Sequence, residues 1–204
     1  MRSNKHILIL PLAMLLLVSC EQPTAPEPDW WKVDKCSGES PYSYNRAKWS
    51  NLNPVFRFSR SLPESWRDYA EYAAASWNEV HSDLQIKVNK TVVSEEAALD
   101  GKNVVSYGSL PRTNRLGETY LWFNNSTGAL IEADIRLNSD KPLSIGGSTS
   151  TYDVWSVLTH EFGHFCGLDH VNDRTHTMHP DLPFDSKIYR TLCNGDELGL
   201  RRLY

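Results

Sequence analysis

The chain has 204 residues, 23% of them charged, and a formal net charge of −4. This length suffices for one domain with a hydrophobic core, but not comfortably for two. Because the net charge is negative and no basic stripe occurs, we exclude nucleic acid as a partner. We expect a globular protein that is a monomer.

The N-terminus has the pattern of an export signal. Arg2 and Lys5 precede an apolar run at residues 7–18, which is too short to span a bilayer. The run ends in Leu17-Val18-Ser19-Cys20, which resembles a bacterial lipobox; in lipoproteins the cut falls before such a cysteine, which carries the lipid. The alternative is an ordinary secretory signal with an incidental cysteine. We expect a signal peptide at residues 1–19 and an exported lipoprotein, anchored in the outer membrane or at the cell surface.

The next segment has the composition of a tether. Residues 21–29 are rich in proline and acidic residues and cannot bury much apolar area. We therefore expect a tether and N-terminal segment over residues 20–45. The folded domain should occupy residues 46–204.

Hydrophobic periodicity predicts the elements of this domain. A helix with an apolar stripe should span residues 66–80, with Ser61 and Glu64 as a capping box before it. Further helices are expected at residues 153–166 and 195–203, the last one capped by Asn194. The order of elements indicates an α+β fold in which helices pack on one sheet. Strands are predicted at residues 54–58, 84–88, 103–107, 119–123 and 130–137.

Residues 160–170 have the spacing HExxHxxGxxH. On a helix, His160 and His164 lie one turn apart on one face and can share one Zn²⁺ ion. Glu161 projects about 100° away, where it can act as general base on an attacking water. Gly167 can adopt a positive φ and end the helix, so that His170 returns as the third ligand. Three nitrogen ligands leave one position open, which is typical of a catalytic zinc site.

This pattern resembles the extended motif of the metzincin clan, in which a methionine turn follows the third histidine. Here that turn would surround Met178. Within the clan the chain is most similar to the matrixins, the family of the matrix metalloproteinases, over residues 50–204. The resemblance implies a zinc-dependent endopeptidase with a twisted mixed five-stranded sheet, two main helices and a short C-terminal helix. The matching segments are residues 132–138, 156–164, 167–170, 178–180 and 196–204.

The resemblance also implies roles around the zinc. The protein or peptide substrate would lie extended, antiparallel to an edge strand at residues 119–123. Met178 would form an apolar floor beneath the histidines, while Pro180 and Leu182 would help to wall the pocket for a substrate side chain. One catalytic Zn²⁺ is implied, and Ca²⁺ is compatible with the family. Residues 104–138 contain no histidine, so we do not expect the family's second, structural zinc.

Three cysteines remain besides Cys20. In the matrixin fold the active-site helix, which holds Cys166, packs against the segment that holds Cys193. We therefore expect a Cys166–Cys193 disulfide, which export permits. Cys36 would be left over, either as a thiolate plug on the zinc or as an unpaired or differently paired cysteine.

The sequence leaves two other functions open. A zinc-binding module at the cell surface would keep the fold and the metal with little catalysis, although it would not need Glu161. A structural lipoprotein would fill the fourth zinc position with a protein ligand, for which His176 and His179 are the nearby candidates.

Overall fold

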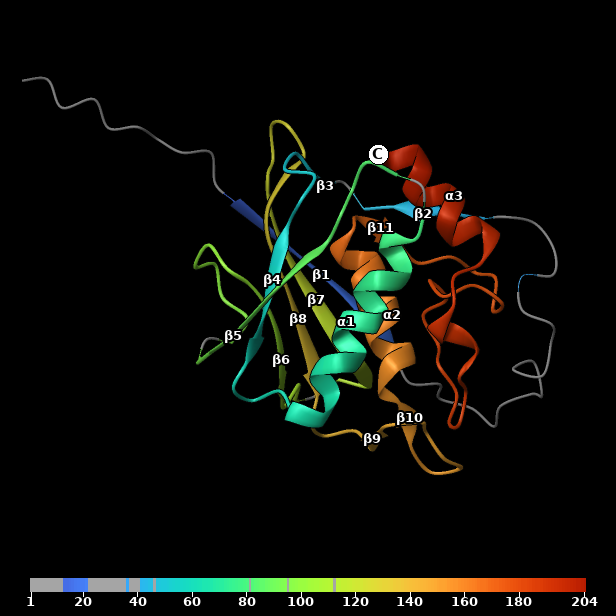
Figure 1. The fold of residues 1–204 in the computed structure, drawn as a ribbon. Helices are drawn as coiled ribbons and strands as arrows, with labels where there is room; N and C mark the ends of the chain where they lie inside the picture. The colour runs from blue at the N-terminus through green and yellow to red at the C-terminus, as the bar shows by residue number, and fades with distance from the viewer. Residues whose placement is uncertain are drawn as a thin grey trace, which may run out of the picture.

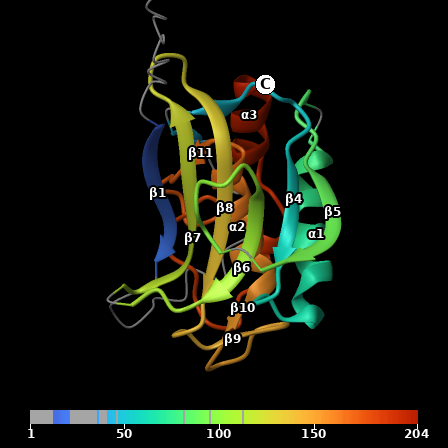
Figure 2. The same ribbon diagram turned by 90° about the vertical axis from the view of Figure 1, so that its left-hand side faces the viewer.

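A computed structural model describes residues 13–21, 36, 41–45, 47–80, 82–94, 96–111 and 113–204. A twisted sheet forms one layer, and the helices α1 (Glu64–Asn78) and α2 (Val154–Phe165) pack on one of its faces (Figure 1). From the sheet side, both helices lie behind the strands (Figure 2). The predicted α+β fold is confirmed.

The central sheet consists of β4 (Val55–Ser59), β5 (Lys87–Val93), β6 (Asn103–Gly108), β7 (Arg115–Asn124) and β8 (Ala129–Asn138). Their order across the sheet is β7-β8-β6-β4-β5. β7 and β8 are antiparallel, and the other neighbours are parallel. This is the mixed five-stranded sheet that the family resemblance implies.

One further strand extends this sheet at β7, and the sequence did not predict it. β1 (Ala13–Glu21) pairs antiparallel with β7, from Ala13 opposite Asn124 to Cys20 opposite Gly117. Figure 2 shows β1 beside β7 at the margin of the sheet. With β1 paired to it, β7 is not an edge strand, so the edge position that the resemblance implied for residues 119–123 is wrong for this structure. Removal of residues 1–19 would expose it again, and that removal stays a prediction.

Two predicted helix caps are wrong. No side chain caps α1, which follows Pro63. Ser61 Oγ instead accepts the backbone N–H of Tyr107 at 3.1 Å. The last helix, α3 (Asn194–Leu203), begins after Cys193 rather than Asn194, and Asp196 completes its capping box. The number and order of the helices are nevertheless those predicted.

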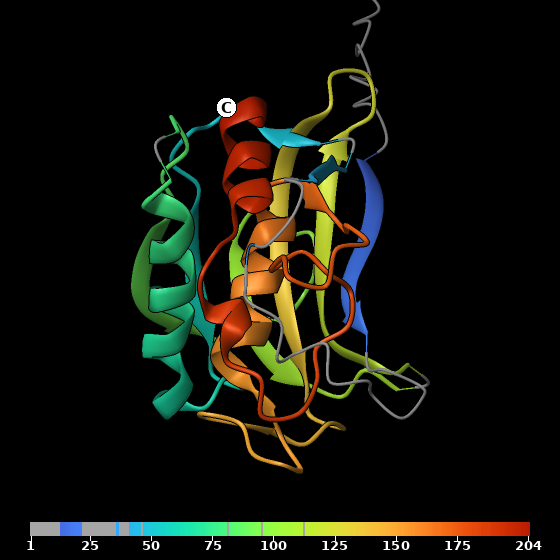
Figure 3. The ribbon, with the colours of Figure 1, turned by 90° about the vertical axis from the view of Figure 1, so that its right-hand side faces the viewer.

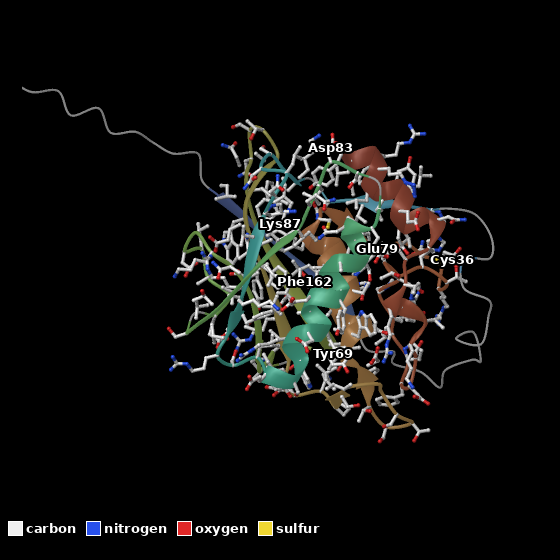
Figure 4. All side chains as sticks on the ribbon, viewed as in Figure 1. Cys36, Tyr69, Glu79, Asp83, Lys87 and Phe162 are labelled. Atoms are coloured by element: carbon white, nitrogen blue, oxygen red, sulfur yellow. A yellow bond between two sulfur atoms is a disulfide. The ribbon has the colours of Figure 1, made fainter. Side chains whose placement is uncertain are left out.

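The helix α2 lies at the centre of the core. All of its residues except Trp155 are buried. α1 packs against it, and the indole N–H of Trp77 donates to the Thr159 carbonyl at 2.9 Å. On the sheet side, Phe162, which is labelled in Figure 4, meets Phe56 of β4 edge-on. The ring centroids are 5.0 Å apart. The helix that carries the zinc motif is thus held from both sides.

The segment before the first central strand also packs on the domain. β2 (Ser43–Tyr44) pairs with β11 (Leu168–Asp169), which follows α2, and β3 (Lys48–Trp49) pairs with β8. The Asn45 N–H donates to the Gly167 carbonyl at 3.0 Å. Contacts with the domain therefore begin before residue 46, and the division at that residue stays a prediction. The other short elements are β9 (Leu143–Ser144), β10 (Tyr152–Asp153) and the 3-10 helix η2 (Ile188–Arg190).

None of the helices within the described ranges combines the length and the apolar character that a bilayer crossing requires.

The disulfide joins Cys36 to Cys193, with 5.0 Å between their Cα atoms, so the predicted Cys166–Cys193 pair is wrong. Cys166 follows α2 as a buried free thiol, and burial raises its pKa. Cys166 instead lies near the C-terminal end of α3, where the Tyr204 hydroxyl donates to the Cys166 carbonyl at 2.8 Å. Cys193 lies a helix length away, about 15 Å for ten residues. Because Cys36 is disulfide-bonded, it is not a thiolate plug on zinc.

Cysteine variants test this pairing. Replacing Cys36 and Cys193 together by serine should lower the free energy of unfolding by about 2–5 kcal/mol, because the bond joins segments that are 157 residues apart. Cys166→Ala is the matched control and should keep the disulfide. Denaturant unfolding measures the free energy of unfolding of both variants, and non-reducing peptide mapping of the wild-type chain identifies which cysteines are linked. Recovery of a peptide that links Cys166 to Cys193 would contradict the structure.

Gly167 ends α2 in a conformation that other residues rarely adopt. Its φ is +100°, and its N–H donates to the His164 carbonyl at 2.9 Å. A Cβ at this position would lie 2.5 Å from the carbonyl oxygen of Ala47. Both the backbone angle and the close approach of the N-terminal segment therefore require glycine here.

We expect Gly167→Ala to lower the free energy of unfolding by about 3 kcal/mol, because it combines a left-handed backbone with a steric clash. The matched control is Gly146→Ala. Gly146 has a φ of +83°, but nothing lies within 4 Å of an added Cβ, so only the backbone cost of about 1 kcal/mol applies. Denaturant unfolding measures the free energy of unfolding of both variants. Equal losses in the two variants would show that the close approach of Ala47 does not contribute.

Candidate metal centre

Three histidines converge beside α2. His160 and His164 project from this helix, and His170 follows the turn that Gly167 starts. Their Nε2 atoms lie 3.0 Å apart between His164 and His160, 3.1 Å between His164 and His170, and 3.2 Å between His160 and His170. The spacing in the sequence thus brings all three predicted ligands to one point.

Backbone carbonyls determine which ring nitrogens carry protons. His160 Nδ1 lies 2.7 Å from the Thr177 carbonyl, and His164 Nδ1 lies 3.0 Å from the Leu168 carbonyl. A carbonyl oxygen only accepts, so both Nδ1 atoms must be the N–H donors. In the neutral rings Nε2 is then unprotonated, and two lone pairs face each other at 3.0 Å. Such an arrangement requires a cation between them.

The environment keeps these rings neutral, as metal ligation requires. Burial lowers the pKa of His160 to about 3, and the nearby His170 acts in the same direction. Burial also lowers the pKa of His164 well below its usual value, with further contributions from His160 and His170. Neutral imidazoles are therefore available for a metal across the physiological pH range.

The three nitrogens fit Zn²⁺. Tetrahedral zinc with Zn–N bonds of about 2.0–2.1 Å has its nitrogen ligands about 3.3 Å apart, close to the observed separations. Within the described ranges, only these three histidines form a group of histidine, cysteine or acidic side chains close enough to share one ion. His179 is engaged elsewhere, since its Nδ1 accepts the Asp181 N–H at 3.1 Å. Neither His176 nor His179 belongs to the group, which argues against a closed structural site.

The loop around Met178 orients the first of these ligands. The Asp196 carboxylate of α3 accepts the N–H groups of Thr177 at 3.0 Å and Met178 at 3.3 Å. Met178 is 1% exposed, and its sulfur packs where a side chain on Gly163 would collide with it. The Thr177 carbonyl is thereby held against His160. Figure 3 shows the loop, coloured orange to red, in front of α2, with α1 on one side and β1 on the other.

Glu161 points from α2 towards β7. Its side chain is fully buried, and its Oε2 accepts the Thr119 hydroxyl at 2.6 Å. Gly117, two residues earlier on β7, lies beside Oε1, which would be 2.8 Å from an added Cβ. The carboxylate therefore lies between the motif helix and the strand that the resemblance assigns to substrate.

Three residues of this site are not evident from the zinc motif. Asp196 could have been found from its place three residues after the N-cap residue Cys193, where an acid often closes a capping box. Thr119 and Gly163 are identified only by their partners across the fold. Gly163 occupies an unspecified position of the zinc motif and Thr119 lies on the predicted substrate strand, but neither residue type by itself indicates these contacts.

The predicted pocket residues follow the Met178 loop. Leu182 is 2% exposed within the core, and Pro180 is partly buried. Their role as pocket walls stays a prediction. A hollow of about 600 Å³ borders His170, between residues 41–43 and residues 171–173.

Two carboxylates of β8 hold the loop before β6. Asp134 accepts the N–H groups of Ala98 at 3.0 Å and Val104 at 2.7 Å, and Glu132 accepts that of Asp100 at 3.0 Å. Burial raises the pKa of Asp134 to about 8 and also raises that of Glu132. Backbone donors therefore already contact these oxygens. The calcium ion that the resemblance allows stays a prediction.

Several known proteins are similar to this chain in sequence. Stromelysin-3 of Xenopus laevis is 24% identical over 204 residues, which cover 91% of this chain and 38% of that protein. Matrix metalloproteinase-16 of Homo sapiens is 33% identical over 78 residues, or 38% of this chain and 13% of its own. Metalloendoproteinase 1 of Glycine max is 39% identical over 56 residues, or 28% of this chain and 18% of its own.

The chain thus spans well under half the length of these relatives. The family model described as Matrixin matches residues 57–204, which is well over half of the chain. The three histidines form a zinc site of the type found in that family. The chain belongs to the matrixin family.

Proposed function

We propose that this chain is a zinc-dependent endopeptidase that hydrolyses peptide bonds in proteins. The observation that carries the proposal is the convergence of three imidazole nitrogens at one point, with the buried Glu161 next to His160 on the same helix. Zn²⁺, when bound, supplies Lewis acidity to the scissile carbonyl and to an attacking water. The three histidines leave one side of the ion for these groups.

Glu161 is the proposed general base. It takes a proton from the attacking water as the new C–O bond forms at the scissile carbonyl. It then delivers that proton to the amine nitrogen as the C–N bond breaks. Its burial between α2 and β7 excludes bulk water from the carboxylate, and Thr119 contacts its Oε2 at 2.6 Å.

The substrate is proposed to lie extended and antiparallel along β7. The pairing of β1 supports this, because it demonstrates that the outer side of β7 accepts an extended segment in that direction. Residues 13–19 lie opposite residues 118–124, and this stretch includes the predicted substrate strand at 119–123. In the same proposal, Met178 forms the floor of the metal site, and Pro180 and Leu182 wall the pocket for one substrate side chain.

We also propose that the protein is exported and anchored through a lipid on Cys20. Family membership and the Cys36–Cys193 disulfide agree with export, because such bonds form and persist outside the cytoplasm. Removal of residues 1–19 would leave Cys20 as the first residue. The same cut would remove most of β1 and open β7 to substrate.

The central test is Glu161→Ala. The variant should retain one zinc ion per chain, because the three ligands remain, but should lose at least about 100-fold in kcat/KM for peptide cleavage. Metal analysis and digestion of a peptide library measure the two properties. Glu64→Ala, at an exposed acid of α1, is the control and should cleave like the wild type.

Undiminished cleavage by Glu161→Ala would disprove the mechanism. A zinc-loaded wild-type chain that cuts nothing in the library would instead favour the surface binding module.

A second test concerns the N-terminus. Cys20→Ser in the complete chain should block both the lipid and the cut, so the protein should carry no fatty acid and should cleave peptides at least about 10-fold more slowly while β1 covers β7. The control is the same substitution in a chain that begins at residue 20, which lacks the lipid but should be active. Fatty-acid labelling and peptide cleavage are measured for both, and equal cleavage rates would rule out competition between β1 and substrate.

A further inference from the structure

The inward face of β7 makes a close contact with the proposed general base. Side chains two residues apart on a strand point to the same side, so Gly117 and Thr119 both face α2. Thr119 and Glu161 are both fully buried. The zinc motif contains neither of these two strand residues.

The Thr119 hydroxyl can donate only one hydrogen bond. Its Oγ1 lies 2.6 Å from Glu161 Oε2 and 3.1 Å from the backbone carbonyl oxygen of Glu161. A separation of about 2.5–2.7 Å is typical of an O–H group that donates to an ionised carboxylate. The hydroxyl therefore donates to Oε2, the shorter contact.

The other carboxylate oxygen lies over Gly117. A Cβ on this residue would approach Oε1 to 2.8 Å and Cδ to 3.1 Å, which is closer than ordinary contacts allow. The missing side chain at position 117 therefore leaves room for the carboxylate. Together the two strand residues define one orientation of the Glu161 side chain.

We infer that Thr119 is a positioning residue for Glu161, with Gly117 providing the space. This inference rests on the proposed peptidase function. A glutamate side chain has several rotatable bonds, and ordering it costs free energy at the moment of reaction unless the fold has already done so. The Thr119 hydroxyl supplies that order, because it restrains one oxygen and thereby directs the whole carboxylate.

Two substitutions separate the hydroxyl from the shape of the side chain. Thr119→Val keeps the branched shape but removes the donor, whereas Thr119→Ser keeps the donor. We expect Thr119→Val to lower kcat by about 10-fold to 100-fold, because the base is misplaced, while KM and zinc content stay within twofold. Thr119→Ser should restore kcat to near the wild-type value.

A double-mutant cycle identifies the group through which Thr119 acts. In a Glu161→Ala background, Thr119→Val should cause no further loss of the residual rate, because the carboxylate is already absent. A kcat of Thr119→Val equal to that of the wild type would overturn the inference. Failure of Thr119→Ser to recover activity, or a full additional loss in the Glu161→Ala background, would also overturn it.

The outcomes distinguish this inference from the function on which it rests. A zinc-loaded wild-type chain that cleaves no peptide would overturn both the proposed peptidase function and the positioning role of Thr119. A wild-type chain that cleaves peptides and loses activity with Glu161→Ala, but not with Thr119→Val, supports the function and overturns the positioning role alone.

Discussion

His160 and His164 must present unprotonated Nε2 atoms to the same point, and two backbone carbonyls impose this state. Each ring donates its Nδ1 proton to a carbonyl that lies beyond the end of α2, on Thr177 or Leu168. The helix alone brings the rings together but leaves their tautomers undetermined. Every segment that holds these carbonyls in place therefore helps to prepare the histidines for a metal ion.

Residues near both termini of the domain hold those segments in place. Asp196 at the start of α3 accepts two backbone N–H groups of the Met178 loop, which fixes the Thr177 carbonyl. The Leu168 carbonyl follows Gly167 in β11, and β2 from the N-terminal segment pairs with this strand. The Cys36–Cys193 disulfide joins that N-terminal region to the residue that caps α3. The stability of these outer segments therefore also determines whether His160 and His164 are oriented to bind a metal.

The sequence was sufficient where the structure depends on local spacing. One helical turn separates His160 and His164, and Gly167 permits a chain reversal, so the ligand set could be derived from residue intervals. It was insufficient where the outcome depends on contacts between segments that are far apart in the sequence. Ser61 contacts a strand instead of capping α1, and the strand expected at residues 84–88 begins at Lys87 and continues to Val93. The cysteine pairing failed for a related reason, since helix packing was predicted without knowing which end of α3 meets α2.

β7 can contribute to the proposed reaction through two sets of groups, its backbone and its side chains, which point in perpendicular directions. Its backbone groups lie in the plane of the sheet, where β1 pairs in the complete chain and where a substrate strand is proposed to pair. Its side chains project out of that plane, and Thr119 reaches the Glu161 carboxylate at 2.6 Å. Because both sets of groups belong to one rigid strand, the register of a bound peptide and the orientation of the base are set by the same backbone. A substrate that paired out of register would therefore present its scissile bond to a correctly ordered carboxylate at the wrong distance, so strand pairing would contribute to the selection of the bond as well as to binding.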